Sequence, residues 1–219
     1  MRRNNRLWAV LSCCAFSLGL ATERGFSQGA YLHAGAGVSL AEKVDLNSFF
    51  GPPPGTRIKF DPGIRLSAAG GYSFCPFMAV ELETGIIYNN VKRIEGFGEI
   101  DAALSHVPML ANLVLRYEGS KCPVIPYVGA GVGGDFSIIT LDRVSTESVF
   151  ADGSDTSLNF AWQAFAGIRY KLNDKMSMGG AYKYYSVDRA SWDFGGFQDG
   201  IQIGRAKTHS ILFDFSMSF

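Results

Sequence analysis

The sequence lacks an excess of either charge, since its 219 residues hold 20 Lys and Arg against 20 Asp and Glu. A neutral balance excludes nucleic-acid binding driven by a general basic field. Cysteine is scarce: only two of the four cysteines, Cys75 and Cys122, lie beyond residue 21, and two are too few for a disulfide scaffold. Charged residues are also few, at 18%, whereas 47% of the chain is hydrophobic, and this combination excludes a disordered protein.

Glycine and aromatic residues are abundant instead. The chain contains 26 Gly and 17 Phe, and aromatic residues make up 13% of it. Glycine destabilises helices by roughly 1 kcal/mol per residue, while aromatic side chains favour strands. The composition therefore predicts an all-β protein.

The N-terminus has the layout of a secretory signal peptide. Residues 1–6 carry three arginines, residues 7–21 form an uncharged apolar stretch, and Glu23 and Arg24 follow. A membrane anchor is the alternative, but this stretch is shorter than the ~20 residues that span a bilayer. We expect cleavage after Ala21, or as late as Ala30. Removal of residues 1–21 leaves a mature chain with a net charge of −3. The predicted barrel domain covers about residues 30–219.

Beyond the signal, apolar and polar residues alternate with a period of two, which is typical of strands. The C-terminal segment is the clearest case, with apolar residues at Ile211, Phe213, Phe215, Met217 and Phe219. Eight such segments are predicted: 31–41, 63–74, 80–89, 106–117, 124–138, 160–172, 176–187 and 209–219. Short turns at 75–77, 118–123 and 173–175 alternate with long polar loops at 42–60, 90–105, 139–157 and 188–207.

This arrangement predicts an eight-stranded antiparallel up-and-down transmembrane β-barrel. The strands of a soluble barrel or sandwich also alternate between apolar and polar residues. Three features favour a membrane barrel: the export signal, full charges in mid-strand on the polar face, and aromatic residues near the strand ends. These aromatic residues are Tyr72, Tyr88, Tyr117, Tyr170, Tyr184 and Phe219.

Three motifs resemble a known family: residues 126–134, residues 165–171 with the turn 173–175, and the terminal strand ending at Phe219. They are similar to the small eight-stranded outer-membrane proteins that include the OmpA membrane domain and the opacity-type surface proteins. The resemblance implies a bacterial outer-membrane location, with the N-terminus in the periplasm and the long loops outside. It also implies insertion by the barrel assembly machinery, which would read an assembly signal at Phe213, Phe215, Met217 and Phe219.

If the apolar faces meet lipid, the polar faces meet in the lumen. An eight-stranded barrel is barely wide enough for its own side chains, so opposed charges should form ion pairs that close it. The predicted lumen network consists of Arg65, Glu81, Glu83, Arg116, Asp135, Arg169, Lys171, Lys183 and Asp214.

No catalytic or metal-binding arrangement is predicted, and no cofactor is expected. His209 and Ser210 are adjacent on a strand, so they point to opposite faces and cannot act as base and nucleophile. We therefore expect a non-enzymatic barrel that serves envelope integrity or surface contact. The alternatives are a small-solute channel and an outer-membrane lipid-modifying enzyme.

Two further predictions concern the two ends of the barrel. Cys75 and Cys122 lie in neighbouring short turns, where they either form a disulfide or remain free thiols. Aromatic residues in the long loops either contact an extracellular ligand or host surface, or pack over the barrel mouth. These are Phe49, Phe50, Trp192, Phe194 and Phe197. A monomer with no nucleic-acid partner is expected.

Overall fold

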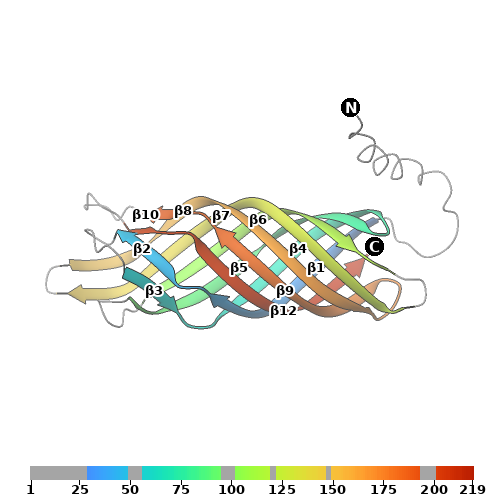
Figure 1. The fold of residues 1–219 in the computed structure, drawn as a ribbon, viewed down its shortest axis with the longest axis horizontal. Helices are drawn as coiled ribbons and strands as arrows, with labels where there is room; N and C mark the ends of the chain where they lie inside the picture. Colours follow the sequence, from blue (N-terminus) through green and yellow to red (C-terminus); the bar gives the residue numbers. More distant parts are fainter. Residues whose placement is uncertain (1–28, 49–55, 95–101, 119–121, 147–148, 193–200) are drawn as a thin grey trace, which may run out of the picture.

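The computed structural model describes residues 29–48, 56–94, 102–118, 122–146, 149–192 and 201–219. Within them, eight long strands form a barrel (Figure 1). They are β1 (Gly29–Ala41), β4 (Gly63–Cys75), β5 (Met78–Ile94), β6 (Ala102–Arg116), β7 (Val124–Thr146), β8 (Val149–Lys171), β9 (Met176–Val187) and β12 (Ala206–Ser218). The predicted signal peptide and the loop residues Phe49, Phe50, Phe194 and Phe197 lie outside the described residues.

The barrel is closed by antiparallel pairing all the way round. β1 pairs with β12 from Tyr31↔Ser218 to Ala41↔Thr208 and with β4 on its other side. The circuit continues through β5, β6, β7, β8 and β9 back to β12. The prediction of an eight-stranded up-and-down barrel is therefore confirmed, and each predicted segment coincides with one barrel strand.

The long connections differ from the prediction, because much of their length forms strands. β2 (Val44–Ser48), β3 (Thr56–Phe60), β10 (Ala190–Trp192) and β11 (Ile201–Ile203) lie in two segments that were expected to be polar loops. They pair in the order β10–β11–β2–β3–β5 and so extend the sheet beyond the barrel. We call these four strands the extension. Figure 1 places β2, β3 and β10 at the end of the barrel away from the C-terminus.

A third predicted loop, 139–157, is largely strand as well. β7 and β8 stay paired as far as Thr146↔Val149, with an irregularity between Leu141 and Val144. Pairing satisfies backbone groups that a long irregular loop would leave to water.

The two faces of the barrel wall have opposite character. Large apolar side chains are exposed on the outside, including Leu82 at 73%, Ile211 at 62% and Phe213 at 58%. Charged side chains are buried on the inside, and Arg65 and Asp135 are each 0% exposed. In the described part of the chain there is no helix with the length and apolar character needed to cross a membrane.

Candidate functional site in the barrel interior

One buried carboxylate gathers donors from four other strands. Lys183 Nζ lies 2.6 Å from Oε1 of Glu83, and Arg65 Nη2 lies 3.2 Å from the same oxygen. The amides of Asn112 and Gln163 donate to Oε2 at 2.8 and 2.7 Å. None of the five is more than 3% exposed. A buried carboxylate bonded on both oxygens avoids the cost of an unpaired charge, so these residues form a stable plug, which we call the Glu83 plug.

A second cluster surrounds Asp214 of β12. Arg169 Nε lies 3.3 Å from Oδ2 of Asp214, and the hydroxyl of Tyr127 donates to the same oxygen. The Arg169 guanidinium carbon also lies 4.2 Å from the centre of the Tyr127 ring. Arg169 Nη2 is 2.9 Å from Nδ1 of His33. The cluster thus links β1, β7, β8 and β12 across the interior.

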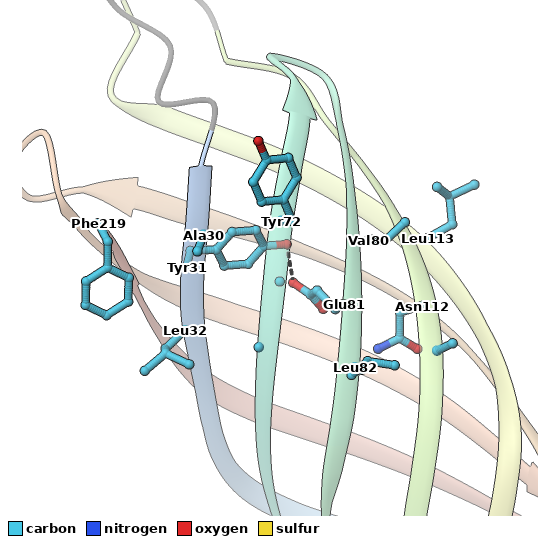
Figure 2. A pocket seen from close by; sticks show the side chains of 13 residues that line it. Ala30, Tyr31, Leu32, Tyr72, Val80, Glu81, Leu82, Asn112, Leu113 and Phe219 are labelled. Atoms are coloured by element: carbon cyan, nitrogen blue, oxygen red, sulfur yellow. Dashed lines mark hydrogen bonds between the residues drawn. The ribbon is translucent and has the colours of Figure 1, made fainter.

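Glu81 has a partner other than the basic residue that was expected. It accepts a hydrogen bond of 2.8 Å from the hydroxyl of Tyr31, which Figure 2 shows between β1 and β5. The Tyr31 ring crosses the inner side of β4 at Gly71, where an added Cβ would lie 2.4 Å from the ring. Glycine at this position is therefore what lets the tyrosine reach the carboxylate.

The remaining two predicted charges lie near the short turns. Arg116 forms no ion pair with the expected acids; it is half-buried and donates to Ser73 Oγ at 2.9 Å and to the Pro76 carbonyl at 3.2 Å. Lys171 is also half-buried and pairs with Glu118 at 3.0 Å. Both positions are close to the end of the barrel, where water can solvate a charge.

Asp135 is likewise bound by groups that the charge count did not include. His106 Nδ1 lies 2.8 Å from its Oδ2, and Tyr185 donates to its Oδ1 at 2.7 Å. Ser137 donates to Oδ2 at 2.5 Å. The indole of Trp192 then covers this group and donates to the Ser137 carbonyl at 2.9 Å.

Above this group the interior becomes apolar. Buried residues from the extension and from the adjoining ends of the barrel strands form one core, which we call the extension core. Trp192 belongs to it and is only 1% exposed, so this residue packs over the barrel mouth and is not available for surface contact. Other members include Val44, Leu46, Ile58, Val187, Ile201 and Ile203.

Ser137, His106 and Asp135 share the residue types of a hydrolase triad but not its geometry. Ser137 Oγ lies 3.2 Å from His106 Nδ1, the same nitrogen that contacts Asp135. In a triad the nucleophile and the acid contact opposite ring nitrogens. None of the three is more than 3% exposed. In the part of the chain that the structure describes, no group of three or more His, Cys, Asp or Glu is placed to hold a metal ion.

His209 lies on the outer face of β12 near the extension, whereas Ser210 is buried on the inner face. The imidazole is 2.6 Å from the Tyr182 hydroxyl and 2.9 Å from Oε1 of Glu42. This hydrogen bond, with Lys207 nearby, holds the pKa of the Glu42 carboxyl below its ordinary value. The arrangement is a polar cluster on the outer wall, and Ser210 is not part of it.

Cys75 and Cys122, the two cysteines within the described residues, carry free thiols, so the structure does not contain the disulfide that the sequence left open. Cys75 is buried at the end of β4, whereas Cys122 is exposed. The two sulfurs therefore occupy different environments.

Several interior residues of the network are absent from the predicted set. Tyr31, Tyr127 and Tyr185 each donate to a buried carboxylate, and His33 contacts Arg169. The signal that identifies these residues is parity, since each lies an even number of positions from an inward charge or glycine on its own strand.

Sequence comparison connects this architecture to known proteins. A profile of the outer membrane protein beta-barrel domain matches residues 9–219, nearly the whole chain. No curated protein sequence matches the chain significantly.

Solved structures show the same fold at low sequence identity. OprG from Pseudomonas aeruginosa has a TM-score of 0.60 at 18% identity, with 89% of this chain and 99% of that chain covered. Neisserial surface protein A has a TM-score of 0.57 at 13% identity, with 87% and 97% covered. AlkL, solved in lipid bilayers, has a TM-score of 0.54 at 18% identity, with 91% and 94% covered.

Proposed function

Because the chain belongs to the outer membrane protein beta-barrel family, we propose that it is a non-enzymatic barrel of the bacterial outer membrane with a closed lumen. In this proposal it serves envelope integrity and makes surface contact through its extracellular part. The observation that carries the proposal is a double closure: the Glu83 plug lies in the barrel, and the extension core lies over its mouth.

The plug argues against a small-solute channel. An eight-stranded barrel leaves an interior just wide enough for side chains. Here that space holds hydrogen-bonded groups from five strands, and Arg65 and Gln163 in it are 0% exposed. A solute would have to displace buried charges from their partners, which is costly.

The interior geometry also argues against an enzyme. Ser137, His106 and Asp135 are buried together, but Ser137 and Asp135 both contact the same nitrogen, Nδ1, of His106. The imidazole therefore does not link the serine to the aspartate through its two nitrogens, as a catalytic base must. Trp192 also covers the group. A lipid substrate approaching from the membrane would reach none of these atoms.

The test of the closed lumen is conductance in planar lipid bilayers. We expect a flat trace for the folded protein under an applied voltage, with a known porin in the same bilayers as the positive control. Discrete current steps that scale with protein concentration would contradict the proposal.

Surface contact is supported by the extension, which holds polar side chains on a folded sheet above the membrane. Val44 and Leu46 anchor β2 from the inside, while Asp45 and Arg57 pair at 3.1 Å on the outside. The contact hypothesis for Phe49, Phe50, Phe194 and Phe197 remains a prediction.

Binding of cells that display the protein tests this surface. Charge reversal by Arg57→Glu on β3 should reduce attachment to host cells several-fold. Lys175→Glu, an exposed lysine of a short turn at the opposite end, is the matched control and should have no effect. If both variants attach as well as the parent, the face that carries Arg57 is not part of the contact surface.

A further inference from the structure

The outer wall carries a groove at the end of the barrel with the short turns, which is the periplasmic end in this family. Two adjoining hollows, of about 710 and 480 Å³, share Leu32, Gly70 and Leu82 as lining residues. Figure 2 shows the larger hollow, with Leu32 and Phe219 on one side and Val80, Leu82 and Leu113 on the other.

The register explains why the wall is hollow here. Leu32, Gly70, Leu82 and Ala111 face each other across four neighbouring strands, so large and small side chains alternate at this level. One level further along, Ala34, Ala68 and Thr84 are neighbours on three strands, flanked by Phe215 and Met109.

The floor of the groove separates it from the lumen. Tyr31, Glu81 and Asn112 lie behind the small residues and are no more than 4% exposed. They are tied to one another or to the Glu83 plug by hydrogen bonds. An occupant must therefore enter from the membrane side, where the rim is apolar and exposed: Leu82 at 73% and Phe219 at 65%.

The length and direction of the groove match one half of a bilayer. It begins at Ala30, Tyr72 and Phe219 beside the periplasmic turns and ends at Ala34 and Thr84. Four residues of strand rise ~13 Å, or about 10 Å along the membrane normal at the usual strand tilt. The apolar band of such barrels is about 25 Å tall, so the groove runs from the interface to near the middle.

We propose that this groove is a binding site for one acyl chain of a phospholipid in the periplasmic leaflet. The groove continues the lipid-contacting wall, is lined almost entirely by apolar side chains and follows the path of an acyl chain from the interface inward. A second copy of the barrel fits less well. A two-fold symmetric contact uses the same patch on both subunits, so it would set one hollow against another.

Gly70 provides the test, because a side chain can be added there without a clash. A Cβ at Gly70 would meet only Leu32 Cδ2, at 3.9 Å. Gly180 on β9 is the matched control: it also lies on the lipid side, outside the groove, and its Cβ would meet only the Leu212 carbonyl at 3.6 Å. Gly70→Phe should fill the groove, whereas Gly180→Phe should leave it open.

The experiment purifies the three full-length proteins from outer membranes in mild detergent and counts retained phospholipid by native mass spectrometry. We expect one retained phospholipid in the parent and in Gly180→Phe. In Gly70→Phe we expect about a tenfold loss of occupancy, because the added ring takes the space of the acyl chain and removes its van der Waals contacts with the groove. A phosphatidylethanolamine with a photoreactive acyl chain should crosslink to β4 and β5 in the parent but not in Gly70→Phe.

Equal lipid retention by all three proteins would overturn the proposal. A dimer mass in the parent that disappears in Gly70→Phe would assign the groove to a second copy instead. Slower gel migration after boiling verifies that each variant is folded. If Gly70→Phe fails this check, Ala111→Phe on β6 fills the same hollow from another strand and is held to the same outcomes.

Discussion

The interior of the barrel and the interior of the extension have opposite character, although one continuous antiparallel sheet forms both walls. In the barrel the inside is polar and the outside is apolar, as at Glu83 and Leu82 of β5. In the extension the inside is apolar and the outside is polar, as at Ile58 and Arg57 of β3. The period of the alternation stays at two while its polarity reverses.

β12 shows the change in the outer face within a single strand. Its outward residues begin with Lys207 and His209 and continue with Ile211 and Phe213. Lys207 and His209 contact Glu42, whereas Ile211 and Phe213 are exposed apolar side chains. The medium outside the sheet decides whether the outward or the inward residues of a strand are apolar. Lipid requires apolar outward residues, whereas water outside the sheet permits apolar inward residues. The membrane boundary therefore lies between His209 and Ile211.

The largest expected effect is on the polar interior. Glu83→Ala leaves the buried Lys183 and Arg65 without their carboxylate and should lower the free energy of unfolding by about 3–5 kcal/mol. Urea unfolding in lipid vesicles, followed by tryptophan fluorescence, measures this. Glu118→Ala, which breaks a partly exposed pair with Lys171, is the control and should cost about 1 kcal/mol or less. Equal costs would mean that the plug is not the stabilising element.

The next effect concerns the extension core. Ile203→Ala removes a side chain that is 2% exposed and should cost about 3 kcal/mol. We expect the loss to be local, because β11 pairs with β10 and β2 rather than with a barrel strand. Hydrogen exchange should accelerate in β2 and β11 and remain slow between β1 and β12. Faster exchange throughout the barrel would show that the two regions unfold together.

The membrane boundary can be mapped by arginine substitution along the outer face of β12. Phe213→Arg should cost about 2–4 kcal/mol, because a charge deep in the lipid zone is destabilising. His209→Arg should be nearly neutral, at about 0–1 kcal/mol, because this position is outside that zone. Folding titrations in bilayers compare the two, and similar values would contradict the boundary between His209 and Ile211.

The smallest effect is a change in one pKa. The hydrogen bond from His209 lowers the pKa of Glu42 below 4.5, so its contribution to stability is present above that pH and is lost as the pH falls further. His209→Ala should raise the pKa of Glu42 toward 4.5, as measured by NMR titration of the side-chain carboxyl. Because Glu42 is exposed, we expect little change in the unfolding midpoint. An unchanged pKa would mean that the imidazole does not bind this carboxylate in solution.

Much of the barrel follows from local pattern. Period-two alternation identified all eight long strands, because each is long enough for the pattern to repeat several times. It also placed Arg65, Glu83, Arg169 and Lys183 on the inner face. The same pattern did not predict the strands of the extension. β10 and β11 have only three residues each, and their apolar residues point inward and not outward.

Partner choice is what the sequence left undecided. Counting charges predicted that Asp135 and Glu81 would pair with lysine or arginine, but they bind His106 and Tyr31. A strand's alternation determines which face a side chain occupies, because successive residues point to opposite sides. Which atoms then meet depends on inter-strand register and on closure of the sheet, and only the tertiary structure supplies these. For the same reason, the burial of Trp192 in the extension core and the groove at Gly70 depend on the tertiary structure, which brings distant strands side by side.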